Sequence, residues 1–503
     1  MRQRGSMTVF CALAFMLVAS FLFALLELAR LQSLAVLADR KSELCLEAVC
    51  SEYQPVLWEE YRLLGLDASY GGGDFSMEKV NGKMSGRVND NLTMTGDGAN
   101  ILALGLSDVR PVSYQVLTDG DGTVFMECVA GYMRQHLPQE AAKKIYERYR
   151  ENTEVEQSGA KEDNVQNAQN ALDEARRAAE EERADEEDGT KSGQESPVQG
   201  GGDTKAETEK EKENPIELVL RLKQNALLSM VTDVGALSER RISLEDSIEK
   251  RECIEGTAAA PQKPEWYERI LVTEYLDAYF SDFTNPNEAH ALAYELEYVL
   301  GGAASDRENL EKTVGKILLV REAANVAHIL GDAGKRQAAN EAAALLAGFT
   351  GNPAVIKVVE IGIVAAWAYM ESVLDVRALL SGERIALIKN AGQWTTTLGN
   401  LSAAFESDSR AAGCPEGLSY QDYLKAFLFV MNQKHLAYRM MGIMEQNVRF
   451  LQNQNDFRMD YVIGRMDYEV IYQAEPLFSR LSVLGDGRLA TMEIESHTRF
   501  SYY

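Results

Sequence analysis

One uncharged stretch near the N-terminus constrains this chain more than any other feature. Residues 5–26 form a run of 22 residues without a charged side chain. About 20 apolar residues in a helix are enough to cross the hydrocarbon core of a bilayer. Arg2 and Arg4 precede the run and Glu27 follows it. Because basic residues favour the cytoplasmic side, the sequence predicts that residues 1–30 are a cytoplasmic tip and a single transmembrane helix, with everything after them extracytoplasmic.

The alternative interpretation of this run is a cleaved signal peptide. Such peptides have an apolar core of about 7–15 residues and a small-residue cleavage site. Here the run is longer and leads directly into Leu28, Leu31, Leu34 and Leu37, whose three-residue spacing forms one helical stripe. We therefore expect a membrane helix that continues into a helical spine. An ordinary anchor followed by a separate packed helix fits the same periodicity.

The N-terminal residues also resemble a known family. The resemblance covers about 30 of the 503 residues and lies in Arg4-Gly5-Ser6, Thr8-Val9 and Glu27-Leu28-Ala29-Arg30. These pieces are similar to the N-terminus of TadE/TadG-like proteins, which are pilin-like accessory proteins of the bacterial tight-adherence (Tad/Flp) pilus. In such proteins a processing glycine, at the place of Gly5, is usually followed five residues later by Glu, where this chain has Phe10. The resemblance implies a pilin-like spine and a place in a surface assembly.

A strongly acidic segment interrupts the chain at residues 151–215. It holds 20 acidic and 8 basic residues, a net −12 of the −26 carried by the whole chain, with four large apolar residues and no aromatic one. Such a segment cannot bury enough surface to offset the entropy of ordering it, so it is predicted to be a disordered linker or insertion. The acidic balance also argues against nucleic acid as a partner, because phosphate repels such a surface.

On either side of this segment the sequence predicts an α+β, mainly α, fold. Residues 31–150 are expected to form a helical stalk and a small α+β region, and residues 216–503 a mainly helical extracytoplasmic domain with C-terminal strands. We predict strands at Lys79–Met94, Val112–Leu117, Arg384–Ile388, Met466–Val470 and Met492–Phe500, and helices at Val124–Tyr149 (broken near Pro138), Ser305–Gly331, Pro353–Leu380 and Tyr423–Leu451. The C-terminal strands are expected to pair with Val112–Leu117, which would close one fold across the acidic segment.

Part of the second region resembles a large extracytoplasmic bacterial domain of unknown function that is associated with Tad-type pilus clusters. The resemblance covers most of residues 216–503 and implies no functional residues. It lies in Tyr294–Gly301, Asn309-Leu310, Arg321-Glu322, Asn325, Ala366-Trp367 and Glu371-Ser372.

A search for catalytic, cofactor and metal motifs predicts no site of any of these kinds. None of the five histidines (His136, His290, His328, His435 and His497) has a short metal-ligand spacing, and no nucleophile elbow or Walker loop is present. Three segments imitate ligand-binding loops. Gly331–Lys335, a partial match to a phosphate-binding loop, is better explained as a helix stop, and Asp119–Gly122, a partial match to a calcium loop, as a turn. Gly485–Ala490 imitates a dinucleotide-binding loop, but a β-like stretch follows it, so no helix N-terminus would face a pyrophosphate.

Three further expectations concern packing. Arg321 extends an apolar helical stripe, so we expect it to be partly buried and paired with Glu295 or Glu297. The helix over residues 354–380 is expected to be a buried helix rather than a second span, because its longest uncharged run has only ten residues. The cysteines outside the membrane run allow two interpretations: disulfides joining Cys253 with Cys414 and Cys128 with Cys45 or Cys50, or reduced and buried thiols.

Together these patterns predict a non-enzymatic, membrane-anchored accessory or minor component of a Tad-type pilus or related assembly. Its partners would be the bilayer and other pilus or membrane proteins, and it would form homo- or hetero-oligomers. The contacts would be made by the N-terminal helix, where small residues permit close helix packing: Ala12, Ala14, Ala19 and Ser20. The alternatives are a membrane-anchored hydrolase of cell-wall polymer, which needs paired carboxylates in a groove, and an extracytoplasmic ligand-binding partner of a sensor.

Overall fold

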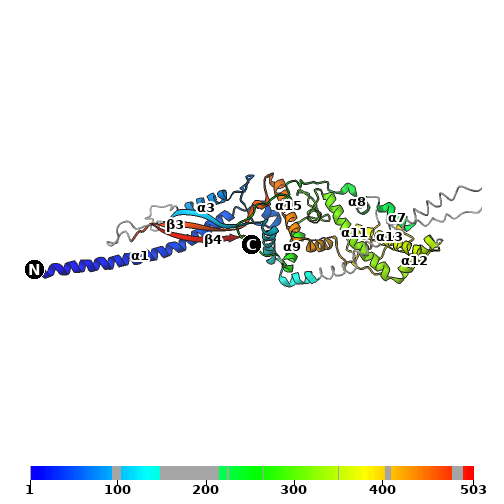
Figure 1. Ribbon diagram of the computed structural model, residues 1–503, viewed down its shortest axis with the longest axis horizontal. Helices are drawn as coiled ribbons and strands as arrows, with labels where there is room; N and C mark the ends of the chain where they lie inside the picture. Colours follow the sequence, from blue (N-terminus) through cyan, green and yellow to red (C-terminus); the bar gives the residue numbers. More distant parts are fainter. Residues whose placement is uncertain are drawn as a thin grey trace, which may run out of the picture. The chain divides into compact units, whose positions relative to one another are not determined.

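The computed structural model shows an α+β fold that is mainly helical (Figure 1). It describes residues 2–92, 104–147, 214–223, 226–263, 265–348, 351–402, 409–478 and 491–503. The predicted acidic linker at 151–215 lies outside the described residues, except for its last two positions. The chain forms two compact units, which are described separately: unit 1 contains residues 1–139, 243–275 and 432–503, and unit 2 contains residues 140–242 and 276–431.

Unit 1 begins with one long helix, α1 (Arg2–Cys50). The predicted continuation of the apolar run into a helical spine is confirmed, and the helix ends at Cys50. A short helix, α2 (Pro55–Tyr61), follows, with Gln54 as its N-cap and Pro55 in its first turn. Figure 1 shows that the N-terminal part of α1 extends past the sheet, whereas its C-terminal part lies along it.

The sheet of unit 1 is antiparallel and has β3 (Val462–Ala474) as its central strand. β3 pairs with β2 (Leu104–Val116), with β4 (Met492–Ser501) and with the two-residue β1 (Leu66–Asp67). Val109 of β2 lies opposite Val470, which lies opposite Ser496 of β4. The predicted pairing with Val112–Leu117 is confirmed for the strand at Met466–Val470, where Met466 lies opposite Tyr114, but it is wrong for the strand at Met492–Phe500, which pairs with β3 instead.

One face of this sheet is covered by the C-terminal half of α1 and by α3 (Met77–Leu92). Alternate side chains of β3 point into this core, as a half-buried strand requires. The predicted strand at Lys79–Met94 is wrong, because Val80, Met84 and Val88 are spaced four residues apart and form one buried face of a helix. The core side chains include Leu34, Leu46, Val49, Val80, Met84, Val88, Met466, Tyr468, Val470 and Tyr472.

The turn Asp119–Gly122 is confirmed at the start of α4 (Asp119–Arg134). Gly120, Asp121 and Gly122 all have positive φ, so the regular helix begins at Thr123. A Cβ on Gly122 would lie 2.5 Å from the Cβ of Ala437, so the turn needs glycine there for space as well as for conformation. A further helix over 139–147 follows the expected break at Pro138.

Unit 2 is helical, and its main helices agree with the predicted ones. α11 (Asp306–Gly331) starts at the N-cap Ser305, and α13 (Pro353–Leu380) starts at the N-cap Asn352. α12 (Ala333–Ala347) packs with both, and Asp332 caps its N-terminus directly after α11 ends, which confirms the helix stop at Gly331–Lys335. Further helices among the described residues are α7 (Pro215–Lys223), α8 (Leu227–Val231), η1 (Val234–Ala236), α9 (Trp266–Tyr279), α10 (Glu295–Gly301), α14 (Tyr420–Val430), α15 (Gln433–Gln452) and η4 (Met459–Tyr461).

Two predicted elements in this part of the chain are wrong. The single helix at Tyr423–Leu451 is two helices, α14 and α15, because Met431 is extended and Asn432 caps a new helix through its side chain. The strand at Arg384–Ile388 is reduced to one isolated bridge between Ile385 and Leu418. The capping box of Ser419 and Asp422 is present in full.

Candidate functional site

The N-terminal half of α1 presents the most unusual surface in the described part of the chain. All but one of its described large apolar side chains are exposed, from 46% for Met16 and Leu25 to 74% for Phe15; the exception, Phe23, is half-buried. Beyond residue 30 the pattern reverses, and Leu34, Ala38 and Leu46 are buried against the sheet. Soluble proteins rarely expose a continuous apolar surface of this length, whereas lipid or neighbouring helices would cover it.

The length of this surface matches a bilayer. The 22 uncharged residues of one continuous helix span about 33 Å at about 1.5 Å per residue, against a hydrocarbon core of about 30 Å. Among the described residues, α1 from Met7 and α13 are the helices long and apolar enough to cross a membrane. Residues 362–380 of α13 are buried in unit 2, as a core helix requires, so the buried interpretation fits α13 better than a second span.

A hydrogen-bonded carboxylate marks the end of the apolar surface. Glu27 Oε1 accepts from Arg30 at 2.5 Å, and Oε2 accepts the backbone N–H groups of Leu477 (3.1 Å) and Phe478 (2.6 Å), which follow β3. Both Glu27 and Arg30 are buried. The junction therefore keeps a charged residue on the helix without leaving it unpaired.

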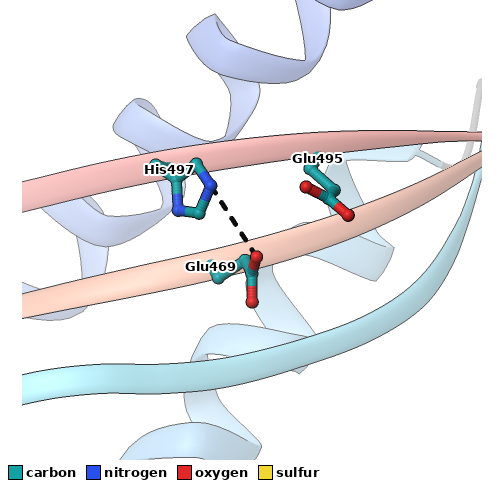
Figure 2. A group of neighbouring side chains, drawn as sticks. All are labelled: Glu469, Glu495 and His497. Atoms are coloured by element: carbon teal, nitrogen blue, oxygen red, sulfur yellow. Dashed lines mark ion pairs between the residues drawn. The ribbon is translucent and has the colours of Figure 1, made fainter.

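On the sheet face opposite the helices, cross-strand pairs carry charge. Figure 2 shows Glu469 of β3 beside Glu495 and His497 of β4, with the ligand atoms of all three within 4.8 Å of one another. These are metal-ligand types, but Glu469 already accepts from the guanidinium of Arg110 and pairs with His497 Nε2 at 3.7 Å. The hydrogen bond from Arg110 lowers the pKa of Glu469. The arrangement is better explained as an ion-pair ladder than as a metal centre.

Unit 2 contains a fully buried charge network that includes Arg321. Its guanidinium donates to Asp375 Oδ2 through Nε (3.0 Å) and Nη2 (2.9 Å), and to the carbonyls of Ala386 and Leu387. Lys389 pairs with Asp375 Oδ1 at 2.5 Å and also with Glu371. The expectation that Arg321 is buried is confirmed, but the expected partner is wrong: Asp375 of α13 takes the place of Glu295 or Glu297. The network fixes the segment after α13 against α11 and α13.

Glu295 and Glu297 serve separate local structures. Glu295 Oε2 accepts the N–H (3.0 Å) and hydroxyl (3.1 Å) of Ser281, and Oε1 lies 2.9 Å from His290 Nδ1. The two side chains meet because His290 lies in the loop before α10 and Glu295 in the first turn of that helix. Glu297 Oε1 accepts from Tyr420 Oη at 2.6 Å and from the Phe283 N–H at 2.9 Å.

The remaining sequence candidates are not assembled into a site in the described residues. Asp119 accepts the backbone N–H groups of Val116 and Gly256 at 2.9 Å each, and Asp121 pairs with Lys434, so the turn is held by protein contacts. The loop Gly485–Ala490 lies outside the described residues.

The six cysteines form no disulfide, so the first of the two interpretations, which joined Cys253 with Cys414 and Cys128 with Cys45 or Cys50, is wrong in this structure. Burial raises the pKa of the Cys50 thiol to about 12, which keeps it protonated and unreactive. The alternative of reduced, buried thiols describes three of the five cysteines outside the membrane run. Cys45, Cys50 and Cys128 are buried, Cys253 and Cys414 half-buried, and Cys11 exposed.

Comparisons with known proteins give one match. The model of a family of unknown function (DUF5702) matches residues 205–474. No curated protein and no solved structure matches the chain. The matched residues run from the acidic segment through unit 2 to the end of β3, and they make up more than half of the 503 residues. The chain belongs to this family of unknown function, DUF5702.

Proposed function

We propose that this protein is a non-enzymatic, membrane-anchored, pilin-like component of a Tad/Flp-type pilus or a related surface assembly. The observation that carries the proposal is the change of surroundings along α1. One helix exposes large apolar side chains over its first half and buries Leu34, Leu46 and Val49 against an antiparallel sheet over its second half. A helix of this kind holds a folded unit at a membrane and offers a surface to neighbouring helices.

The topology belongs to the same proposal. Arg2 and Arg4 favour the cytoplasmic side for the N-terminus, and in this topology both units lie outside the cell. The apolar half of α1 carries small residues, of which Ala12 and Ala14 are exposed and available for close approach by another helix. The similarity of residues 4–30 to TadE/TadG-like proteins supports a pilus rather than another membrane assembly.

A pair of matched substitutions tests the anchor. Leu13 and Leu17 are 61% and 66% exposed on the apolar half of α1, and Val36 is 64% exposed on the same helix beyond Glu27. Changing both Leu13 and Leu17 to Glu adds about 5 kcal/mol or more to the free energy of membrane insertion. We expect this double variant to leave the membrane fraction and Val36→Glu to remain in it. Equal retention of both would contradict the anchor.

Assembly and topology need separate measurements. In intact cells, added protease should digest epitopes in both units and spare a tag at the N-terminus. The wild-type protein, extracted in mild detergent, should co-purify with pilus components, and N-terminal sequencing should show the anchor still attached. Recovery of the protein in the cytosol, or released without its first thirty residues, would overturn the proposal.

A further inference from the structure

Unit 2 contains a positively charged hollow that is independent of the membrane helix and of its proposed function. The hollow has a volume of about 740 Å³, within the range of small-molecule pockets. Its lining comes from the C-terminal end of α13, from α8 and the segment that follows α8, and from Arg410. The chain has a net charge of −26, so two arginines lining the same hollow have the sign opposite to that of the whole chain.

The first of these arginines is fixed in position. Arg377 is 9% exposed, and its guanidinium donates through Nε to the Met230 carbonyl (2.6 Å) and through Nη1 to the Ser409 carbonyl (3.2 Å). Burial, and then the charge of Arg410, lower the pKa of Arg377, so the two guanidinium groups repel each other. Because the carbonyl groups already hold this guanidinium in one conformation, little side-chain entropy is lost when it binds an anion.

The second arginine has no such partner. The Arg410 side chain is exposed, lines the hollow and makes neither a hydrogen bond nor an ion pair with any residue that the structure describes. Thr232 adds a hydroxyl to the lining. Asp233 also lines the hollow, but its Oδ1 already accepts the Gly235 N–H at 2.9 Å as the cap of η1.

We propose that this hollow binds the phosphate group of a phosphate monoester. The planar guanidinium fork of Arg410 matches phosphate oxygens in pairs, and an anion between the guanidinium groups of Arg410 and Arg377 replaces their repulsion by attraction. With the Asp233 carboxylate in the lining beside the two arginines, the hollow carries a net charge of +1. A phosphate monoester, with a charge of about −1.5 to −2 at neutral pH, is attracted to it more strongly than a carboxylate or a phosphodiester, which carries one negative charge. The volume leaves room for the group to which the phosphate is attached.

Equilibrium dialysis of the detergent-solubilised full chain with radiolabelled inorganic phosphate tests the proposal, with ionic strength held constant by chloride. We expect one saturable phosphate per chain. Arg410→Gln should weaken binding about tenfold or more, because it removes a charge-assisted contact. Arg410→Lys, which keeps the charge but loses the fork, should bind between the two. Arg307→Gln, at an exposed arginine of α11 outside the hollow, should bind like the wild type.

Competition identifies the ligand class. Unlabelled methyl phosphate should displace the label, and dimethyl phosphate and acetate should displace it at least tenfold less well. Equal displacement by dimethyl phosphate would overturn the monoester assignment. Binding that does not saturate, or binding by Arg410→Gln equal to the wild type, would overturn the site. Neither result depends on membrane insertion, so the proposed function stands or falls separately.

Discussion

Glu297 offers the sharpest quantitative prediction in unit 2, because it is a fully buried carboxyl group. Its Oε1 accepts from Tyr420 and Phe283, but its Oε2 is buried without a hydrogen-bond partner among the described residues. Burial is the largest effect on the pKa of Glu297 and raises it; the hydrogen bond from Tyr420 lowers it, the nearby Asp282 carboxylate raises it and the Phe283 N–H lowers it, so that burial prevails and the pKa is about 8. The folded protein therefore keeps Glu297 protonated at neutral pH.

The sign of the pH dependence follows from this raised pKa. In the unfolded chain the Glu297 carboxyl has its ordinary pKa of 4.5, so between about pH 4.5 and pH 8 the folded state holds a proton that the unfolded state has released. The stabilisation is complete below pH 4.5 and is lost as the pH rises to 8. Between pH 5 and pH 9 the two pKa values correspond to a loss of about 4 kcal/mol in the free energy of opening, at about 1.36 kcal/mol per pH unit.

Glu297→Gln removes this titration and keeps an acceptor for Tyr420. Hydrogen exchange followed by mass spectrometry on peptides from α10 measures the opening free energy at each pH, and comparing variant with wild type at the same pH cancels the intrinsic exchange rate. We expect the variant to gain about 4 kcal/mol on the wild type between pH 5 and pH 9. Glu311→Gln, at an exposed position of α11, should follow the wild type. Parallel profiles for Glu297→Gln and wild type would refute the reasoning.

Two further predictions concern other parts of the fold. Arg321→Met leaves the carbonyls of Ala386 and Leu387 without their donor and removes one partner of Asp375. Denaturant unfolding should therefore show that the free energy of unfolding of unit 2 falls by about 3 kcal/mol. A fall of less than about 1 kcal/mol would mean that the network contributes little to stability. Two glycines of unit 1 should respond to alanine in opposite directions. Gly86→Ala lies in the middle of α3, where a Cβ meets nothing, and should raise the free energy of unfolding by about 0.5–1 kcal/mol. Gly122→Ala has φ 83° and faces Ala437, so it should lower the free energy of unfolding by about 2 kcal/mol. A change of the same sign for both variants would contradict the assignment of the turn.

The elements that were predicted correctly are those whose signals lie in adjacent residues. Asn352-Pro353 and Gly382 bracket α13, and Ser305 caps α11, because a cap acts on backbone groups within the same turn. The same kind of signal was missed at Asn432, whose side chain caps α15 and so divides the predicted long helix. Residues 79–94 contain both an alternation of polar and apolar residues, which predicts a strand, and a four-residue spacing of Val80, Met84 and Val88, which predicts a helix; the structure follows the second pattern.

The side-chain partners could not be predicted in the same way, because they depend on pairings between distant parts of the chain. Arg321 and Asp375 are 54 residues apart and meet because α11 packs on α13. Glu469 and His497 lie opposite each other through the register of β3 and β4, which no local spacing encodes. The sequence does predict that a buried arginine needs a carboxylate, but several carboxylates were available, and only the helix packing chooses among them.

Hydrogen bonds at Glu27 join α1 to the segment that directly follows the central strand of the sheet. The carboxylate binds backbone N–H groups of Leu477 and Phe478, which lie only three and four residues beyond Ala474, the end of the central strand. Because β3 pairs along its length with β2 and β4, a displacement of α1 at Glu27 is resisted by the sheet as well as by the buried stripe of Leu34 and Leu46. Backbone donors, unlike long side chains, cannot follow a moving carboxylate by changing rotamer. The contact therefore fixes the position of α1 along the sheet at the point where the apolar surface ends, and so sets how far unit 1 stands from the bilayer in the proposed anchored state.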